Sequence, residues 1–132
     1  MSQENVEIVR ESLEAFARRD KAAWSELCDP NLEVVPIGDW PEGEKLRGEE
    51  AVWDFMVTSD EPWKPGSYEM VEVMDNDENV VTRLKRDMQG KSSGVEVHYD
   101  YWLVLTSRYG KALRLEWFEK RDDALEAAGL SE

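Results

Sequence analysis

The spacing of apolar residues changes near Tyr68, from the period of a helix to the period of a strand. Before Tyr68, apolar side chains recur three and four positions apart, whereas after it apolar and polar residues alternate. The predicted helices cover 4–19, 21–28 and 49–59, with a short last helix over 123–128. The predicted strands cover 32–37, 68–75, 79–89, 94–107 and 111–120. Helices followed by long antiparallel strands indicate an α+β fold, in which a curved sheet wraps around three helices.

Short local signals mark where several of these elements begin and end. Asp20 is a plausible N-cap for the second helix, and Asp122 for the last one. Tyr109 and Gly110 stand where a tight hairpin turn is needed. Gly129 followed by an apolar residue predicts a glycine C-cap with its hydrophobic contact.

Acidic residues outnumber basic residues by 30 to 16, so the 132-residue chain carries a net charge of −14. This balance argues against nucleic acid and anionic membranes, because phosphate contacts need Lys or Arg. No apolar stretch reaches about 18 residues, and the N-terminus lacks the charge and apolar run of a signal peptide. Cys28 is the one cysteine, so an internal disulfide is impossible. We expect one cytoplasmic domain over residues 1–132.

Seven segments carry a family resemblance along nearly the whole chain. They are QENVEIVR at 3–10, LEAF at 13–16, the stretch 20–24, DPN at 29–31, RGEEAV at 47–52, SGVEV at 93–97 and DALEAAGL at 123–130. The sequence resembles the SnoaL-like branch of the NTF2-like superfamily. The resemblance implies an NTF2-like cone with a pocket between sheet and helices. Because that superfamily holds ketosteroid isomerases, polyketide cyclases, epoxide hydrolases and non-catalytic binders, it implies no particular reaction.

Two turns predict which strand residues share a face of the sheet. If Tyr109 and Gly110 form a two-residue turn, positions whose numbers sum to about 219 pair across it. The predicted pairs are Leu103 with Glu116, Tyr101 with Phe118, and Tyr99 with Lys120. A symmetric turn over 89–94 adds Thr82, Leu84 and Arg86 to this face. The opposite face receives His98, Asp100, Trp102, Val104 and Arg83. A slip of one residue reverses the assignment, so both registers stay open.

The family resemblance favours the first of these faces as the lining of the pocket. Family members often carry a His and then a Tyr-x-Asp pattern, and these positions correspond to Leu103, Phe118 and Lys120. This chain therefore lacks the usual proton-transfer groups there. The opposite face carries a set of apolar residues that needs a cover, namely Val104, Leu113, Leu115 and Trp117. We expect that cover to be a homodimer interface on the outer face of the sheet.

Glu116 is the first candidate for a catalytic group, because a carboxylate on an inward face is partly desolvated. It would act as a base, with Tyr101 or Arg86 stabilising an oxyanion. The competing interpretation is a structural ion pair with a nearby Arg or Lys. In the reversed register, His98, Asp100 and Arg83 form the catalytic group instead. One histidine without a cysteine cluster predicts no metal site.

The chain contains six tryptophans, which supply rigid contact area for a flat apolar ligand or fill the core. Trp40 lies in a loop bounded by Gly and Pro, and it is the best candidate for a lid. The predicted ligand contacts are Trp24, Trp40, Trp53, Met56, Arg86, Tyr99, Leu103, Phe118 and Lys120.

Two functions fit the sequence. The first is a pocket that binds an apolar, partly polar small molecule, with possible cofactor-free acid/base chemistry of isomerase, cyclase or hydrolase type. The second is a non-catalytic dimeric binding or regulatory module with a largely filled pocket. Neither function requires a cofactor.

Overall fold

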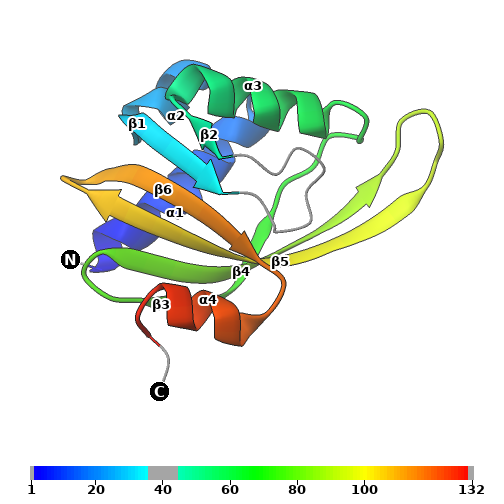
Figure 1. Cartoon of the computed structure of the whole chain (residues 1–132). Helices are drawn as coiled ribbons and strands as arrows, with labels where there is room; N and C mark the ends of the chain where they lie inside the picture. Colours follow the sequence, from blue (N-terminus) through cyan, green and yellow to red (C-terminus); the bar gives the residue numbers. More distant parts are fainter. Residues whose placement is uncertain (1, 36–44, 131–132) are drawn as a thin grey trace.

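Three helices cover one face of a curved sheet, and a fourth helix lies against the other face (Figure 1). The computed structural model describes residues 2–35 and 45–130, with side chains from residue 4 onward. The helical layer consists of α1 (Ser2–Ala17), α2 (Lys21–Glu26) and α3 (Glu49–Asp60), and the fourth helix is α4 (Arg121–Ala127). The predicted α+β fold, with three N-terminal helices and a short C-terminal helix, is confirmed.

The sheet has six strands in the order β2-β1-β6-β5-β4-β3. The strands are β1 (Cys28–Val35), β2 (Leu46–Arg47), β3 (Glu69–Asp75), β4 (Asn79–Gln89), β5 (Glu96–Arg108) and β6 (Lys111–Phe118). Only the β1–β6 pair is parallel, so the described sheet is mixed. The short β2 was not predicted, because two residues are too few to show an alternation.

The start of β1 corrects the predicted end of the second helix. The helix α2 ends at Glu26, and Cys28 already pairs with Ala112 of β6. A register shift between Cys28 and Glu33 accommodates Pro30, which has no N–H for the ladder. The DPN segment therefore lies in an irregular part of the strand rather than after a helix.

Most of the predicted caps and turns have the expected geometry. The Asp20 side chain accepts a hydrogen bond from the backbone N–H of Ala23 at 3.1 Å. Tyr109 and Gly110 have φ of 54° and 75°, as a type I′ hairpin turn requires. Gly129 has φ of 74°, and the N–H of Leu130 donates to the carbonyl of residue 125 at 2.8 Å.

The start of α4 differs from the prediction. Its N-cap residue is Lys120 instead of Asp122, so the helix begins at Arg121. Asp122 lies in the first turn, where a carboxylate favours the positive end of the helix dipole without capping it.

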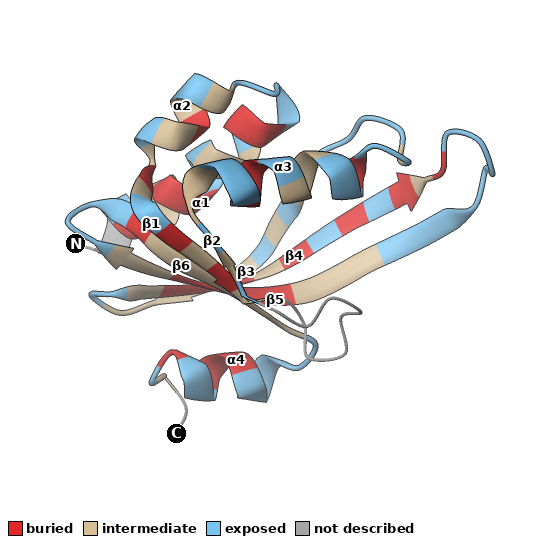
Figure 2. Ribbon diagram, turned by 45° about the horizontal axis from the view of Figure 1, so that its top comes forward, coloured by how far each residue is buried: buried red, intermediate tan, exposed pale blue. Residues whose placement is uncertain are grey.

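Two apolar clusters lie on the two faces of the sheet. The larger cluster joins the helices to the concave face and includes Val9, Phe16, Trp24, Leu32, Val52, Trp53, Leu84, Leu103 and Leu105. The smaller cluster joins α4 to the outer face and includes Val81, Trp102, Val104, Ala124, Leu125 and Ala128. The β4–β5 hairpin extends beyond this body, and its far end is largely exposed (Figure 2).

The register between β4 and β5 agrees with the predicted symmetric turn. The aligned pairs are Thr82 with Leu103, Leu84 with Tyr101, and Arg86 with Tyr99. Leu84 and Leu103 belong to the cluster beneath the helices, so this face of β4 and β5 is concave and faces the helices.

The register between β5 and β6 is the main error of the sequence-based prediction. Ser107 pairs with Ala112 as expected, but Thr106 pairs with Arg114, so Leu113 is an extra residue that forms a bulge. Beyond the bulge, the strands pair one residue away from the predicted register. The resulting pairs are Leu103 with Trp117, Val104 with Glu116, and Trp102 with Phe118. Leu115 and Trp117 therefore face the helices, while Glu116 and Phe118 face the side of α4.

Candidate functional site

Four aromatic side chains cluster on the concave face, and we call them the aromatic wall: Tyr68, Tyr99, Tyr101 and Trp117. The Tyr99 ring centroid lies 5.0 Å from that of Tyr68, 4.7 Å from that of Tyr101 and 6.2 Å from that of Trp117. All three contacts are edge-to-face, the geometry that aromatic rings prefer. Each of these four residues is half-buried.

Three separate segments build the aromatic wall. Tyr99 and Tyr101 lie two positions apart in β5, so they point to the same face of the sheet, and Tyr68 directly precedes β3. The bulge at Leu113 brings Trp117 of β6 onto the same face. The sheet register, and not sequence proximity, therefore assembles this cluster.

A buried ion-pair network lies behind Tyr68. The Arg86 Nη1 donates to Asp60 Oδ1 at 2.6 Å, and the two side chains are only 2% and 8% exposed. Arg19 also donates to the Asp60 carboxylate, and its side chain is 40% exposed. The Arg86 guanidinium carbon lies 5.0 Å from the centroid of the Tyr68 ring. The network thus links the turn after α1, the end of α3 and strand β4 beside the aromatic wall.

Burial raises the pKa of two of the wall hydroxyls, those of Tyr68 and Tyr99. Burial raises the pKa of Tyr99, and the neighbouring Tyr68 and Tyr101 add to the effect. Burial also raises the pKa of Tyr68, although the positive charge of Arg86 opposes it. At neutral pH, Tyr68 and Tyr99 are therefore hydrogen-bond donors as well as apolar surfaces.

The structure separates the first predicted catalytic pair. Tyr101 lies in the aromatic wall, whereas Glu116 lies on the outer face opposite Val104. The Glu116 side chain is 24% exposed, and Arg114 Nη2 approaches its carboxylate at 3.6 Å. The geometry of Glu116 agrees with the competing interpretation, a structural ion pair.

The alternative catalytic group lies on the outer face of the β4–β5 hairpin. Arg83 donates two hydrogen bonds to Asp100, at 2.8 and 2.6 Å, and this lowers the pKa of the Asp100 carboxyl. His98 Nδ1 instead lies 2.7 Å from Asp87 Oδ1, and both side chains are highly exposed. Arg83 and Asp100 are therefore brought together, while His98 pairs with a carboxylate that the prediction did not include.

The remaining predicted ligand contacts fall into three groups. Trp24, Trp53 and Leu103 are buried in the main core, and Met56 packs against it. Phe118 packs against the α4 cluster, and Lys120 is the exposed residue before α4. Arg86 and Tyr99 belong to the concave site. Trp40 lies outside the described residues.

Sequence reasoning missed the roles of Tyr68, Trp117, Asp60 and Arg19 in this site. Asp60 and Arg86 are 26 positions apart, and no local pattern announces that they pair. The predicted register places Trp117 on the other face, because apolar spacing does not reveal the bulge.

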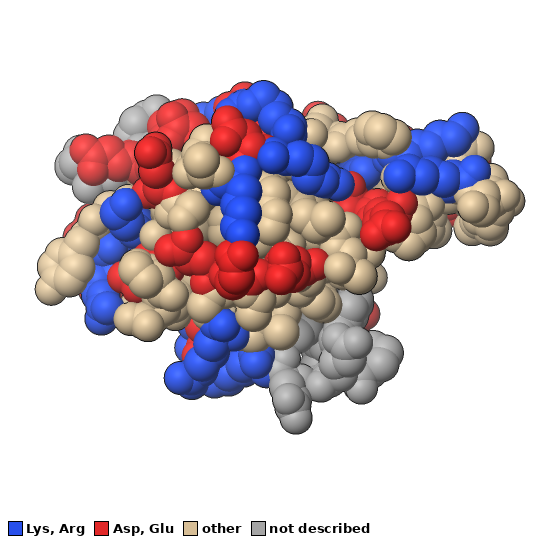
Figure 3. Space-filling view, turned by 90° about the horizontal axis from the view of Figure 1, so that it is seen from above, with Lys and Arg blue, Asp and Glu red and all other residues tan. Residues whose placement is uncertain are grey.

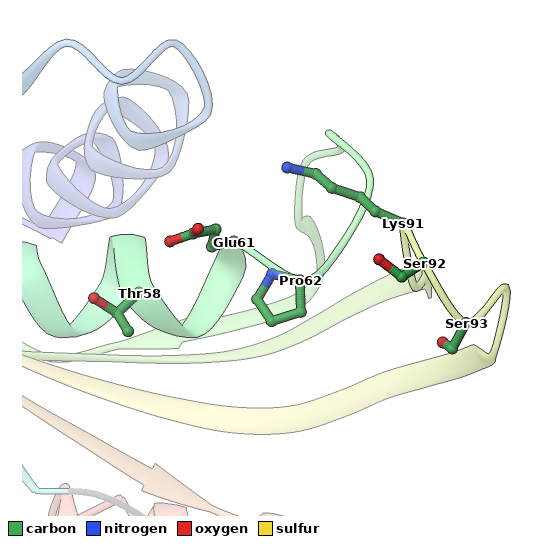
Figure 4. Close-up of a pocket in the computed structure, with 6 residues that line it drawn as sticks. All are labelled: Thr58, Glu61, Pro62, Lys91, Ser92 and Ser93. Carbon is green, nitrogen blue, oxygen red and sulfur yellow. The ribbon is translucent and has the colours of Figure 1, made fainter.

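Two open grooves flank this part of the molecule. One, of about 590 Å³, lies between α1 and the start of β3 and has Tyr68 in its wall; its other lining residues are Arg10, Leu13, Glu14, Ala17, Arg18, Ser67 and Met70. The other, of about 660 Å³, lies between the end of α3 and the β4–β5 turn (Figure 4). Its residues are Thr58, Glu61, Pro62, Lys91, Ser92 and Ser93, none of which belongs to the aromatic wall.

The described residues contain neither a metal-binding cluster nor a membrane-spanning helix. Within 2–35 and 45–130, no group of three His, Cys, Asp or Glu side chains is arranged to hold a metal ion. No helix in the described part of the chain is long and apolar enough to cross a membrane. On the face seen in Figure 3, Lys and Arg side chains are interspersed with Asp and Glu.

Residues 9–115 match the family model of the SnoaL-like domain. The chain belongs to the SnoaL-like domain family. A comparison with curated protein sequences finds no significant match.

Solved structures with the same fold cover almost the whole chain. An NTF2-like protein from Burkholderia xenovorans LB400 is 23% identical, with a TM-score of 0.76, over 97% of each chain. TerC, co-crystallised with polyporic acid, is 21% identical, with a TM-score of 0.75, over 95% of this chain and 97% of its own. A protein from Catenulispora acidiphila with a ketosteroid isomerase-like fold, in complex with trimethylamine, is 14% identical, with a TM-score of 0.72, over 94% and 93%. Solved structures with this fold thus include two that were obtained with small molecules.

Proposed function

We propose that this SnoaL-like protein binds a small, flat, largely apolar molecule against the aromatic wall. The observation that carries the proposal is the Tyr68–Tyr99–Tyr101–Trp117 cluster, whose rings are in contact and whose residues are half-buried on the concave face. Aromatic rings give a ligand broad rigid contact at little conformational cost, and tyrosine hydroxyls orient its polar atoms. TerC, which has the same fold and was co-crystallised with polyporic acid, supports small-molecule binding as the class of function.

Binding fits the geometry better than acid/base catalysis by Glu116. A general base must come within hydrogen-bond reach of the proton that it removes. Glu116 is on the opposite face of the sheet from the wall, and the concave carboxylate of Asp60 is already shared by two arginines. The described concave face therefore offers hydroxyl donors and ring surface, without a free carboxylate among the residues of the wall.

The test is the binding of two probes, the neutral alcohol 2-naphthylmethanol and polyporic acid. Calorimetry measures their affinities, and amide chemical shifts map where they bind. We expect shifts to concentrate on the residues of the aromatic wall. Tyr101→Ala should weaken binding by about tenfold, because it removes a ring that the ligand covers. The same exchange at Tyr109, which is 93% exposed in the β5–β6 turn, is the matched control and should leave affinity unchanged.

Three results would contradict the proposal: no binding of either probe, equal effects of the two tyrosine variants, or chemical shifts confined to other surfaces. Thermal unfolding of both variants separates a loss of the wall from a loss of the fold.

Three of the four apolar residues that suggested a homodimer interface are covered within the chain itself. Leu115 and Trp117 face the helices, and Val104 is covered by α4, which Asn76 and Asn79 tie down through the carbonyl of Ala128. The uncovered part of the outer face carries the Arg83–Asp100 and His98–Asp87 pairs instead. A homodimer through that face, as in a regulatory module, stays a prediction that sedimentation velocity tests. The single domain and the cytoplasmic location likewise stay predictions.

A further inference from the structure

Charge is distributed unevenly beside the aromatic wall. Arg19 and Arg86 share the single carboxylate of Asp60, so this network carries one surplus positive charge. These three side chains are also the charged groups that act on the Tyr68 hydroxyl. A positive site at this position is notable because the whole chain has a net charge of −14.

Arg86 also keeps an unused hydrogen-bond donor. Its Nη1 donates to Asp60 at 2.6 Å and its Nη2 to the carbonyl of Lys64 at 3.1 Å. The buried Nε has no hydrogen-bond partner among the described residues, although the side chain is only 2% exposed. A buried donor without an acceptor costs free energy, so an acceptor brought by a ligand would relieve that cost.

The open groove between α1 and β3 borders the aromatic wall at Tyr68. Tyr68 forms part of its wall, with Leu13 and Met70 as apolar neighbours. Its charged lining residues are Arg10, Arg18 and Glu14, which again leaves one surplus positive charge. The groove therefore gives access to the Tyr68 side of the wall through a surface that attracts anions.

Aromatic clusters often bind cations instead, through the negative face of the ring. Here the Arg86 guanidinium already lies over Tyr68, at 5.0 Å from the ring centroid. A second cation at this ring would be repelled by Arg86 and Arg19. The arrangement thus opposes an ammonium ligand and favours an acidic oxygen.

We propose that the ligand is an aromatic acid, such as a carboxylate or phenolate, whose oxygen is held at Tyr68 and Arg86 while its ring lies on the aromatic wall. This inference rests on the proposed binding function and specifies its ligand class. Tyr68 and Arg86 act as donors to the ligand oxygen. Arg19 acts at a distance, because its positive charge, added to that of Arg86, exceeds the single negative charge of Asp60.

The test compares three probes that share one ring system: 2-naphthoate, the neutral 2-naphthylmethanol and the cation 2-naphthylmethylammonium. Calorimetry on the full chain at pH 7.5 and low salt measures each affinity. We expect 2-naphthoate to bind about tenfold more tightly than the alcohol, and the ammonium to bind most weakly. Added salt should reduce the difference between the three probes.

A matched pair of variants locates the charge. Arg19→Gln should lower the ratio of naphthoate to alcohol affinity by about threefold to tenfold, because it removes the surplus charge while Asp60 keeps Arg86. Arg108→Gln removes the same charge from an exposed site at the end of β5 and should change the ratio by less than about twofold. Tyr68→Phe, which removes one hydroxyl, should also lower the ratio.

The outcomes separate this inference from the proposed function. If the alcohol binds to the wall as tightly as naphthoate, the protein binds flat ligands but the acid preference is wrong. If Arg19→Gln and Arg108→Gln change the ratio equally, the preference reflects net charge and the assigned site is wrong. If no probe binds, the proposed function itself is overturned. The comparison in the unmodified protein decides the first point even if a variant does not fold.

Discussion

Removing the Asp60 carboxylate should strongly destabilise the fold, because it leaves the Arg86 charge buried without a partner. The two side chains are 8% and 2% exposed and 2.6 Å apart. Two unit charges about 4 Å apart attract by about 4 kcal/mol at the effective dielectric near a protein surface. Breaking one side of a buried pair costs about 3–5 kcal/mol. Arg19 is 40% exposed and can be solvated, so its lost contact adds little.

We therefore expect Asp60→Ala to lower the free energy of unfolding by about 3–5 kcal/mol. That is a large share of the roughly 5–15 kcal/mol of a typical domain. Urea titration followed by tryptophan fluorescence measures it, since six tryptophans report on the transition. Asp54→Ala makes the same exchange at an exposed position of the same helix and should change stability by about 0.5 kcal/mol or less.

A double variant tests the reason for the loss. Asp60→Ala combined with Arg86→Met removes both charges, so no unpaired ion stays buried. We expect the double variant to be more stable than Asp60→Ala alone. Two results would refute the argument. One is a loss of unfolding free energy below about 1 kcal/mol in Asp60→Ala. The other is a loss in the double variant that exceeds the sum of the losses in Asp60→Ala and Arg86→Met.

Three further predictions concern other parts of the molecule. Burial raises the pKa of the Cys28 thiol to about 12, so only the unfolded chain, with a thiol pKa near 8.5, ionises as pH rises. Raising the pH from 8.5 to 9.5 should lower the free energy of unfolding of the unmodified protein by about 1 kcal/mol more than that of Cys28→Ala. Urea titrations at both pH values measure it, and equal decreases in the two proteins would contradict the prediction. Gly129→Ala should cost about 1–2 kcal/mol, because φ of 74° is strained for alanine, and an unchanged melting temperature would show otherwise. Glu116→Gln should change the affinity for 2-naphthylmethanol by less than about twofold, and a tenfold loss in calorimetry would return Glu116 to the site.

Local signals in the sequence predicted the elements and several of their ends. The Asp20 cap, the Tyr109–Gly110 turn and the Gly129 C-cap each depend on residues within about five positions of one another. The pairing of β4 with β5 was also predictable, because a symmetric turn sets the register of the strands that it connects.

The bulge at Leu113 limited what could be predicted about the site. One extra residue in β6 moved Glu116 and Phe118 to the outer face and Trp117 to the concave face. Both predicted sites assumed one continuous register along the β5–β6 hairpin. A bulge depends on how the strand packs locally, and the spacing of apolar residues does not reveal it. The same bulge turned Leu115 and Trp117, two of the apolar residues that suggested a homodimer interface, toward the helices, while the homodimer itself stays a prediction.

The sequence by itself determined the α+β architecture and the family, and the family resemblance favoured the face with Tyr99, Tyr101 and Arg86 as the concave one. These follow from periodicity, turn chemistry and family motifs, all of which are written along short stretches of chain. Only the tertiary structure decided that Asp60 joins Arg86, and that Tyr68 and Trp117 complete the aromatic wall. Those contacts join residues far apart in the chain, and their partners are selected by packing and charge burial in three dimensions rather than by spacing in sequence.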